Sequence, residues 1–344
     1  MSESLQTLVD RAAFLSAEVQ QRFGALIAGS DFDVDFSAAP RLRFTGDDPI
    51  TFRPHMIGSS VDRRAEKTWH WGWDNLNGFP DPVVALSARV RDHGTAHGIT
   101  ALTDAELPIE SKDLPLALTL AAKAVTGAWA HYPVAAGGGT TVWVLVDDER
   151  LASTEPALKP VVRAIASGIT GLELSDHRAA LAAYAELRGL RTAALPDGGV
   201  RILCADGSAD VTFDEEERIA SCQAHQPLEG EAAEQFAAVG PVAGTAVFGV
   251  AYDDADESVL EETPPVSAED AAAGERGVPE PAPVPAGAAD DRGESEAAVP
   301  TGTGQAAGEP VAVGPSAPAE RQAPVEKPAE PEEKKGFFKR LFGR

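Results

Sequence analysis

The stretch Trp69-His70-Trp71-Gly72-Trp73-Asp74-Asn75 carries three tryptophans at every second position. Successive side chains of a strand point to opposite faces of a sheet, so Trp69, Trp71 and Trp73 are expected on one face and His70 on the other. Three indoles bury on the order of several hundred Å². The pattern therefore predicts a strand over 68–73 whose aromatic face anchors the core of a small sheet.

A ligand site is the second interpretation of this stretch. Trp69, Trp71 and Trp73 would then line a pocket or a stacking platform, and His70 would be the best single candidate for an acid–base group. The core interpretation is favoured, because the neighbouring sequence supplies no matching set of polar groups that would orient a ligand.

The segments around the tryptophans alternate between helical and strand periodicity. Apolar residues recur at helical spacing over 5–27, and apolar and acidic residues alternate over 31–36. The run Val142-Trp143-Val144-Leu145-Val146 is typical of a buried strand, and Gly137-Gly138-Gly139 predicts a hairpin turn before it. Further helices are expected at 82–93 and 114–129, and further strands at 41–45, 50–57 and 131–136.

A second region follows, with helices expected at 156–168 and 175–189 and short strands at 190–195, 201–205 and 209–213. Asp197-Gly198 and Asp206-Gly207 lie between these strands, and Asp-Gly is a strong hairpin signal. The fold class is therefore predicted as α+β: two small lobes of antiparallel sheet with packed helices, over 1–150 and 151–252.

The first region resembles a family of unknown function that is largely actinobacterial, DUF6882. The resemblance rests on the W-x-W-x-W strand with Asn75, on Val90-Arg91 and His97-Gly98-Ile99, and on Val142-Trp143-Val144-Leu145. It covers roughly residues 1–150. It implies no activity, so no functional residue is carried over from it.

The composition changes sharply after Tyr252. Residues 253–333 contain no aromatic residue, 13 of the 26 prolines, and 20 acidic against 4 basic residues. Such a segment cannot bury enough apolar surface to offset the entropy of ordering it. We therefore expect a disordered acidic linker over 253–333.

The last eleven residues, 334–344, reverse this sign with five basic side chains and no acidic one. An exposed chain end gains nothing for its own fold from apolar side chains, so this basic-aromatic tip is expected to bind a partner protein or an anionic membrane surface. The residues expected to make that contact are Phe337, Phe338, Lys339, Arg340, Leu341 and Phe342.

Motifs of enzymes and metal sites are missing from the sequence: it has no G-x-S-x-G, Walker A, H-E-x-x-H or C-x-x-C. His93 and His97 are four residues apart, but Gly94 and Gly98 argue against a helix there, and two ligands do not complete a site. A surface or capping role is expected for both, and no metal and no cofactor are predicted. Asp31, Asp33 and Asp35 are explained by a solvated strand face, and Cys204 by burial as a small hydrophobe.

The net charge of −25 argues against nucleic acid as a partner, since phosphate binding requires a basic surface. Two cysteines cannot build a disulfide framework, and no segment of about 20 apolar residues is present, so we expect a cytoplasmic protein without a transmembrane segment. The sequence favours a binding or adaptor protein whose tip docks it to a partner or to the inner face of the membrane. The alternative is a small-molecule binding protein or enzyme with a pocket around Trp69–Trp73.

Overall fold

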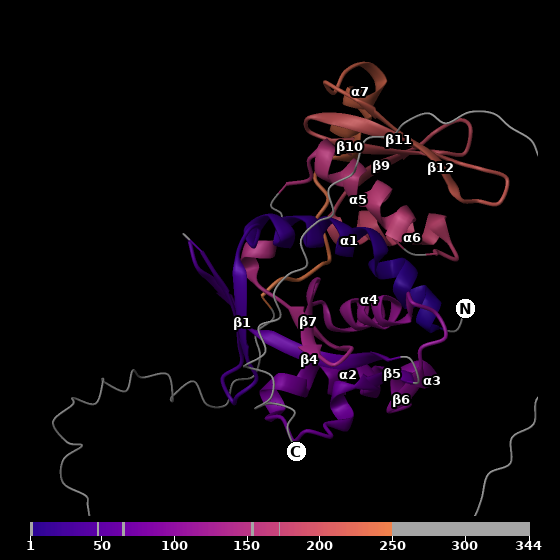
Figure 1. Ribbon diagram of the computed structural model, residues 1–344. Coiled ribbons are helices and arrows are strands. Elements are labelled where there is room, and N and C mark those ends of the chain that lie inside the picture. Colours follow the sequence, from indigo (N-terminus) through magenta and orange to yellow (C-terminus); the bar gives the residue numbers. More distant parts are fainter. Residues whose placement is uncertain (1–2, 47, 64–65, 153–154, 172, 250–344) are drawn as a thin grey trace, which may run out of the picture. The chain divides into compact units, whose positions relative to one another are not determined.

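The computed structural model describes residues 3–46, 48–63, 66–152, 155–171 and 173–249, which all belong to one compact unit (Figure 1). The predicted linker 253–333 and the predicted tip 334–344 lie outside the described residues, so both stay predictions.

Helices and antiparallel sheets make up the described residues, which confirms the α+β fold class. The helices are α1 (Leu5–Leu26), α2 (Asp81–His97), α3 (Thr100–Thr103), α4 (Leu114–Thr126), α5 (Leu158–Gly171), α6 (His177–Arg188) and α7 (Gly230–Val239), with 3-10 turns η1 (Gly72–Asp74) and η2 (Glu149–Leu151). The strands are β1 (Asp31–Asp35), β2 (Arg41–Thr45), β3 (Ile50–Phe52), β4 (Pro54–Arg63), β5 (Glu66–Trp71), β6 (Glu106–Pro108), β7 (Ala130–Gly137), β8 (Thr140–Val146), β9 (Arg191–Ala194), β10 (Val200–Cys204), β11 (Gly207–Phe213) and β12 (Ile219–His225).

Helix α1 contacts elements of both predicted regions. Its start is defined by a capping box, in which Ser4 and Thr7 exchange side-chain to backbone hydrogen bonds. The helix packs against α4 of the first region and against α5 and α6 of the second. An amphipathic helix buries one stripe, whereas α1 has neighbours on more than one side and buries residues around much of its circumference.

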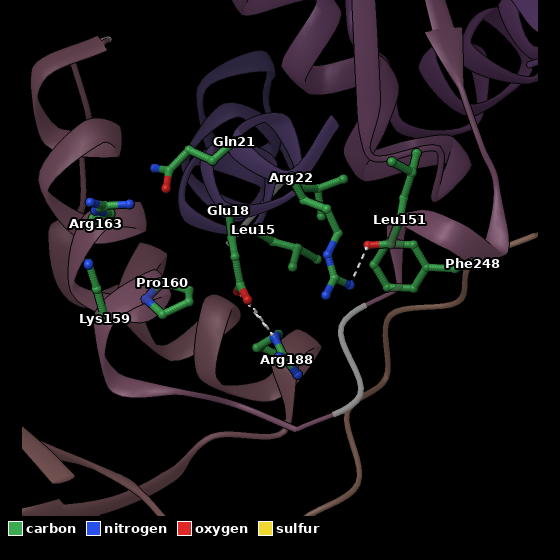
Figure 2. Close-up of a pocket in the computed structure, with 11 residues that line it drawn as sticks. Leu15, Glu18, Gln21, Arg22, Leu151, Lys159, Pro160, Arg163, Arg188 and Phe248 are labelled. Atoms are coloured by element: carbon green, nitrogen blue, oxygen red, sulfur yellow. Dashed lines mark hydrogen bonds and ion pairs between the residues drawn. The ribbon is translucent and has the colours of Figure 1, made fainter. Parts of the chain in front are cut away.

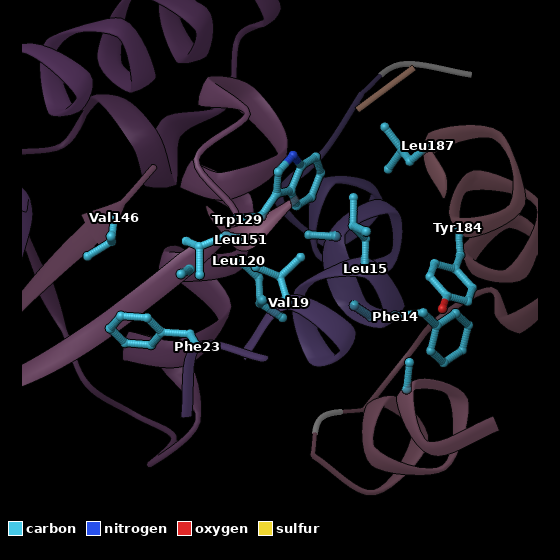
Figure 3. Close-up of a cluster of buried hydrophobic side chains, with 14 of the residues drawn as sticks. Phe14, Leu15, Val19, Phe23, Leu120, Trp129, Val146, Leu151, Tyr184 and Leu187 are labelled. Carbon is cyan, nitrogen blue, oxygen red and sulfur yellow. The ribbon is translucent and has the colours of Figure 1, made fainter. Parts of the chain in front are cut away.

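One hydrophobic cluster accordingly runs through both predicted regions. Figure 3 shows Leu15 and Val19 of α1 with Leu120 and Trp129 to one side and Tyr184 and Leu187 of α6 to the other. The ring of Phe14 meets that of Tyr184 edge-on, with centroids 6.0 Å apart. The position of the boundary at residue 150 stays a prediction, but the packing across it is continuous.

The tryptophan stretch lies in the five-stranded sheet of order β6-β5-β4-β8-β7. Trp69 and Trp71 point to one face of β5 and are buried, with ring centroids 5.2 Å apart. Gly58 on β4 makes room for them, because a Cβ at this position would lie 2.4 Å from the Trp69 ring. The core interpretation is confirmed for these two residues.

Trp73 differs from the expectation of three tryptophans on one strand face. Strand β5 ends at Trp71, and Trp73 lies in the turn η1, where its backbone N–H donates to Ser87 Oγ at 3.0 Å. The Arg91 guanidinium lies over its half-buried ring, 5.6 Å from the centroid. The strand ends before the tryptophan alternation does, because the backbone turns at Gly72, which lies directly against β4. A Cβ at Gly72 would lie 2.8 Å from the Met56 carbonyl oxygen.

The four-stranded sheet, of order β12-β11-β10-β9, contains the three predicted short strands and one more. The sequence did not predict β12, whose Ile219-Ala220-Ser221-Cys222 start has no alternation and whose side chains are largely exposed. Helix α7 was also not predicted. Helix α2 continues through Gly94 to His97, and Gly98 ends it in the left-handed region (φ 68°), which corrects the expectation that a helix around His93 and His97 is doubtful.

Candidate functional site

The predicted site around the tryptophan stretch is spread over buried and half-buried positions. Trp69 and Trp71 are at most 2% exposed, and the Trp71 Nε1–H donates to the Ala101 carbonyl at 3.0 Å. His70, on the opposite face of β5, is half-buried and its Nε2 lies 3.2 Å from Thr68 Oγ1. A ligand-binding role for Trp69, His70, Trp71 and Trp73 stays a prediction, as does binding by the tip residues, which lie outside the described part of the chain.

A cavity of about 330 Å³ lies elsewhere, between α1, α5, α6 and the segment that leads to Phe248. Figure 2 shows Lys159, Pro160 and Arg163 of α5 on one side and Arg22, Leu151 and Phe248 on the other, with Glu18 of α1 between them. Cavities of this size accept small organic ligands. The lining residues are Leu15, Glu18, Val19, Gln21, Arg22, Leu151, Lys159, Pro160, Arg163, Arg188 and Phe248.

A buried ion pair forms part of the wall of this cavity. Arg188 Nε donates to the Glu18 oxygens at 3.0 and 3.2 Å, and both side chains are less than 9% exposed. The Tyr184 hydroxyl donates to Glu18 Oε2 at 2.7 Å. Burial and the neighbouring Glu18 carboxylate raise the pKa of Tyr184 well above its usual value, so this hydroxyl stays a donor.

Arg188 has more donors than Glu18 accepts. Its Nη2 is buried and makes no hydrogen bond to any described residue. A buried guanidinium nitrogen without an acceptor costs free energy, and an anionic oxygen in the cavity would supply that acceptor.

Three further cations line the same cavity, so positive charge dominates it. Lys159 and Arg163 lie one turn apart on α5 and are exposed at the mouth of the cavity. Arg22 donates to the backbone carbonyls of Leu151 and Ala152, which holds its guanidinium beside the cavity. Four basic side chains thus face a single carboxylate, in a protein whose formal net charge is −25.

The remaining wall is apolar. Leu15 and Leu151 are buried core residues, and Phe248 packs against the same hydrophobic cluster. Phe248 is held there because the Ala246 N–H donates to the Leu187 carbonyl and the Gly249 N–H donates to Asp147 Oδ1. The cavity therefore combines a cationic mouth with an apolar side.

A second cavity, of about 520 Å³, is polar, and the basic side chains that line it already have acidic partners. Arg201 donates to both oxygens of Asp210 at 2.7 and 2.9 Å and to Glu231 at 3.2 Å. The Asp210 contact raises the pKa of Arg201 further above its usual range. This cavity offers no unsatisfied cation among the described residues that line it.

No thiol is among the described side chains that line the first cavity. The thiol of Cys204 lies elsewhere in the core, and burial raises its pKa to about 12, so it is no nucleophile at neutral pH. The lining residues of the cavity hold cations, one paired carboxylate, one amide and apolar groups, an arrangement suited to binding.

The cavity could not be predicted from the sequence, because its walls come from distant segments of the chain. More than 130 positions separate Glu18 from Lys159. A signal for it was present in the helix over 5–27: Glu18 interrupts the apolar pattern next to Val19, and a charge at such a position requires a partner.

The comparisons with known proteins concern mainly the first region. No helix among the described residues has the length and apolar character that a membrane span requires. Neither a curated protein nor a solved structure matches the chain significantly. The lining residues Glu18 and Arg22 lie inside the part of the chain that matches a family model, whereas Lys159, Arg163 and Arg188 lie outside it. That model is the one for a family of unknown function, DUF6882: it matches residues 6–149 and confirms the family resemblance of the first region.

Proposed function

We propose that this protein is a non-enzymatic binding protein whose cavity between α1, α5 and α6 takes a small organic anion. The observation that supports the proposal most is the unsatisfied Nη2 of the buried Arg188, in a cavity with three further cations and one carboxylate. An anionic head group bound there would accept hydrogen bonds from Arg188 and reach the mouth residues Lys159 and Arg163.

The chemistry of the walls defines the ligand class. Guanidinium groups bind carboxylate, sulfonate and phosphate oxygens with two parallel hydrogen bonds. The apolar side formed by Leu15, Leu151 and Phe248 favours a ligand with an apolar body. A volume of about 330 Å³ limits that body to roughly two or three rings or a short chain.

Two fluorescent probes test the proposal. The first, 1-anilinonaphthalene-8-sulfonate, carries the sulfonate head, and the second, N-phenyl-1-naphthylamine, is the same ring system without the charge. The full chain is expected to bind the sulfonate at least tenfold more tightly than the neutral amine. This preference is expected to fall as the salt concentration rises, because the charges at the mouth are exposed.

The matched variants are K159Q/R163Q at the mouth and K112Q on the exposed surface, away from the cavity. K159Q/R163Q is expected to weaken sulfonate binding about tenfold or more and to change amine binding less than twofold, whereas K112Q leaves both unchanged. Equal loss of both probes, or no loss in K159Q/R163Q, would contradict the proposal. Arg188 is not substituted, because removing it would leave Glu18 buried and unpaired.

A second proposal rests on the sequence of the chain end. The basic-aromatic tip 334–344 of a cytoplasmic protein would dock this binding body reversibly on the inner face of the membrane, with Phe337, Phe338, Leu341 and Phe342 in the interface and Lys339 and Arg340 at the head groups. Sedimentation of the full chain with anionic vesicles at low salt, and its loss in F338D, tests this. Absence of sedimentation at low salt would direct the search to a protein partner instead.

A further inference from the structure

Two histidines and one glutamate meet where the start of α1 lies beside the end of α2. His93 and His97 are one turn apart on α2, and Glu3 is the residue before the N-cap of α1. The possible ligand atoms of these three side chains all lie within 4.8 Å of one another.

Hydrogen bonds already orient these side chains. The His97 Nδ1–H donates to the His93 carbonyl at 2.9 Å, which leaves the lone pair of His97 Nε2 directed at the cluster. Glu3 Oε2 lies 2.6 Å from His93 Nε2 and 3.7 Å from His97 Nε2. The two imidazole rings are stacked, with centroids 4.1 Å apart. One turn of helix and one carboxylate thus place two nitrogens and one oxygen around a single point.

The backbone on both sides is held in place. The capping box of Ser4 and Thr7 defines the chain direction immediately after Glu3, and Leu8 of α1 and Val90 of α2 belong to one buried cluster. The cluster also lies at the C-terminal end of α2, where the helix dipole places partial negative charge. A cation is therefore favoured at this point by the charge of Glu3 and by the end of the helix.

We propose that Glu3, His93 and His97 bind a zinc ion. Two imidazole nitrogens and one carboxylate are a known ligand set for Zn²⁺, with bonds of about 2.0–2.2 Å and a fourth position left for water. Ligand atoms around a tetrahedral ion of that size are roughly 3.3 Å apart, so the separations of 2.6 and 3.7 Å change by less than about 1 Å on binding. Calcium and magnesium prefer sets made of oxygen only. A zinc ion at this site would link the start of α1 to the end of α2.

Titration calorimetry of the full, tag-free chain with zinc chloride, after removal of metals, tests the proposal. One zinc ion per chain is expected to bind with saturation, and each of E3Q, H93Q and H97Q is expected to weaken that binding about tenfold or more. The control H225Q removes a half-exposed histidine outside the cluster and keeps every acidic residue of the chain. It is expected to bind zinc like the unsubstituted chain.

Melting temperature is the second measurement. Zinc at ten times its dissociation constant is expected to raise the Tm by about 3–6 °C in the unsubstituted chain and in H225Q, and not in the three ligand variants. Magnesium and calcium chloride at the same concentration are expected to leave the Tm unchanged. The proposal is overturned if no saturable zinc site is found, or if the ligand variants bind zinc as tightly as H225Q. Because Glu3 and His97 are partly exposed, E3Q and H97Q are expected to fold, which circular dichroism checks.

Discussion

Lys123 is fully buried on α4, and its Nζ donates to the Ser16 hydroxyl of α1 at 2.7 Å. Burial lowers the pKa of Lys123 well below its usual value, because the interior disfavours the charged amine. His131 is half-buried, and desolvation of its imidazole together with the nearby Lys123 charge lowers the pKa of that imidazole well below its usual value. Folding therefore shifts both bases toward their neutral forms, relative to the unfolded chain.

The sign of the resulting pH dependence follows from proton uptake. Between its lowered folded pKa and the ordinary lysine value of 10.5, Lys123 binds a proton more readily in the unfolded chain. The contribution of Lys123 to the free energy of unfolding therefore rises with pH through that window and is lost as the pH falls. His131 adds the same sign below its ordinary pKa of 6.5.

We predict that K123M raises the free energy of unfolding at pH 7 by about 1–3 kcal/mol, because it replaces a buried amine by an apolar side chain of similar length. It is also expected to flatten the rise of stability between neutral pH and about pH 10. Urea unfolding at several pH values measures both effects. K112M, at an exposed lysine, serves as the control and should change neither. A K123M variant less stable than the unsubstituted chain at pH 7 would show that the Ser16 contact outweighs the burial cost.

At the scale of elements, the crossing of α1 and α5 depends on close approach at one glycine. A Cβ at Gly168 would lie 2.4 Å from the Phe14 ring, and that ring is completely buried against Tyr184. Gly24 near the end of α1 is the opposite case, because nothing lies within 4 Å of its added Cβ. Packing therefore requires a glycine at position 168 and does not require one at position 24.

Two substitutions to alanine test this difference in packing. G168A is expected to lower stability by about 1–3 kcal/mol, because overpacking outweighs the gain in helix propensity. G24A is expected to raise stability by about 0.5 kcal/mol, since only the backbone entropy changes. Thermal unfolding of both variants checks the prediction. Equal effects in the two variants would mean that α1 and α5 adjust their spacing freely.

At the scale of the whole molecule, the segment after α7 returns to the body and completes the cavity. The Thr245 and Ala246 N–H groups donate to the carbonyls of Glu186 and Leu187 at the end of α6. Phe248 then packs on the core cluster and lines the cavity. The described body therefore extends beyond the last helix to Gly249, and the boundary at 252 stays a prediction from the sequence.

Truncations locate this boundary. A chain of residues 1–252 is expected to keep the Tm of the full chain within about 2 °C, because 253–333 offers no aromatic side chain to bury. A chain of residues 1–239 loses the Phe248 packing and its hydrogen bonds, and should be less stable by about 2–3 kcal/mol, or about 4–12 °C. It should also lose the preference for the sulfonate probe. A Tm drop above about 4 °C for 1–252 would mean that the tail packs on the body.

By itself, the sequence determined the α+β class, most element positions and the burial of Trp69 and Trp71, because these depend on periodicities of 2 and 3.6 residues and on local turn chemistry. Exposed elements such as β12 have no such pattern and were missed. Only the tertiary structure decided which polar side chains meet: Glu18 with Arg188, Lys123 with Ser16, and Glu3 with His93 and His97. The physical reason is that each of these contacts joins elements distant in the chain, and α1 packs on more neighbours than one amphipathic stripe can reveal.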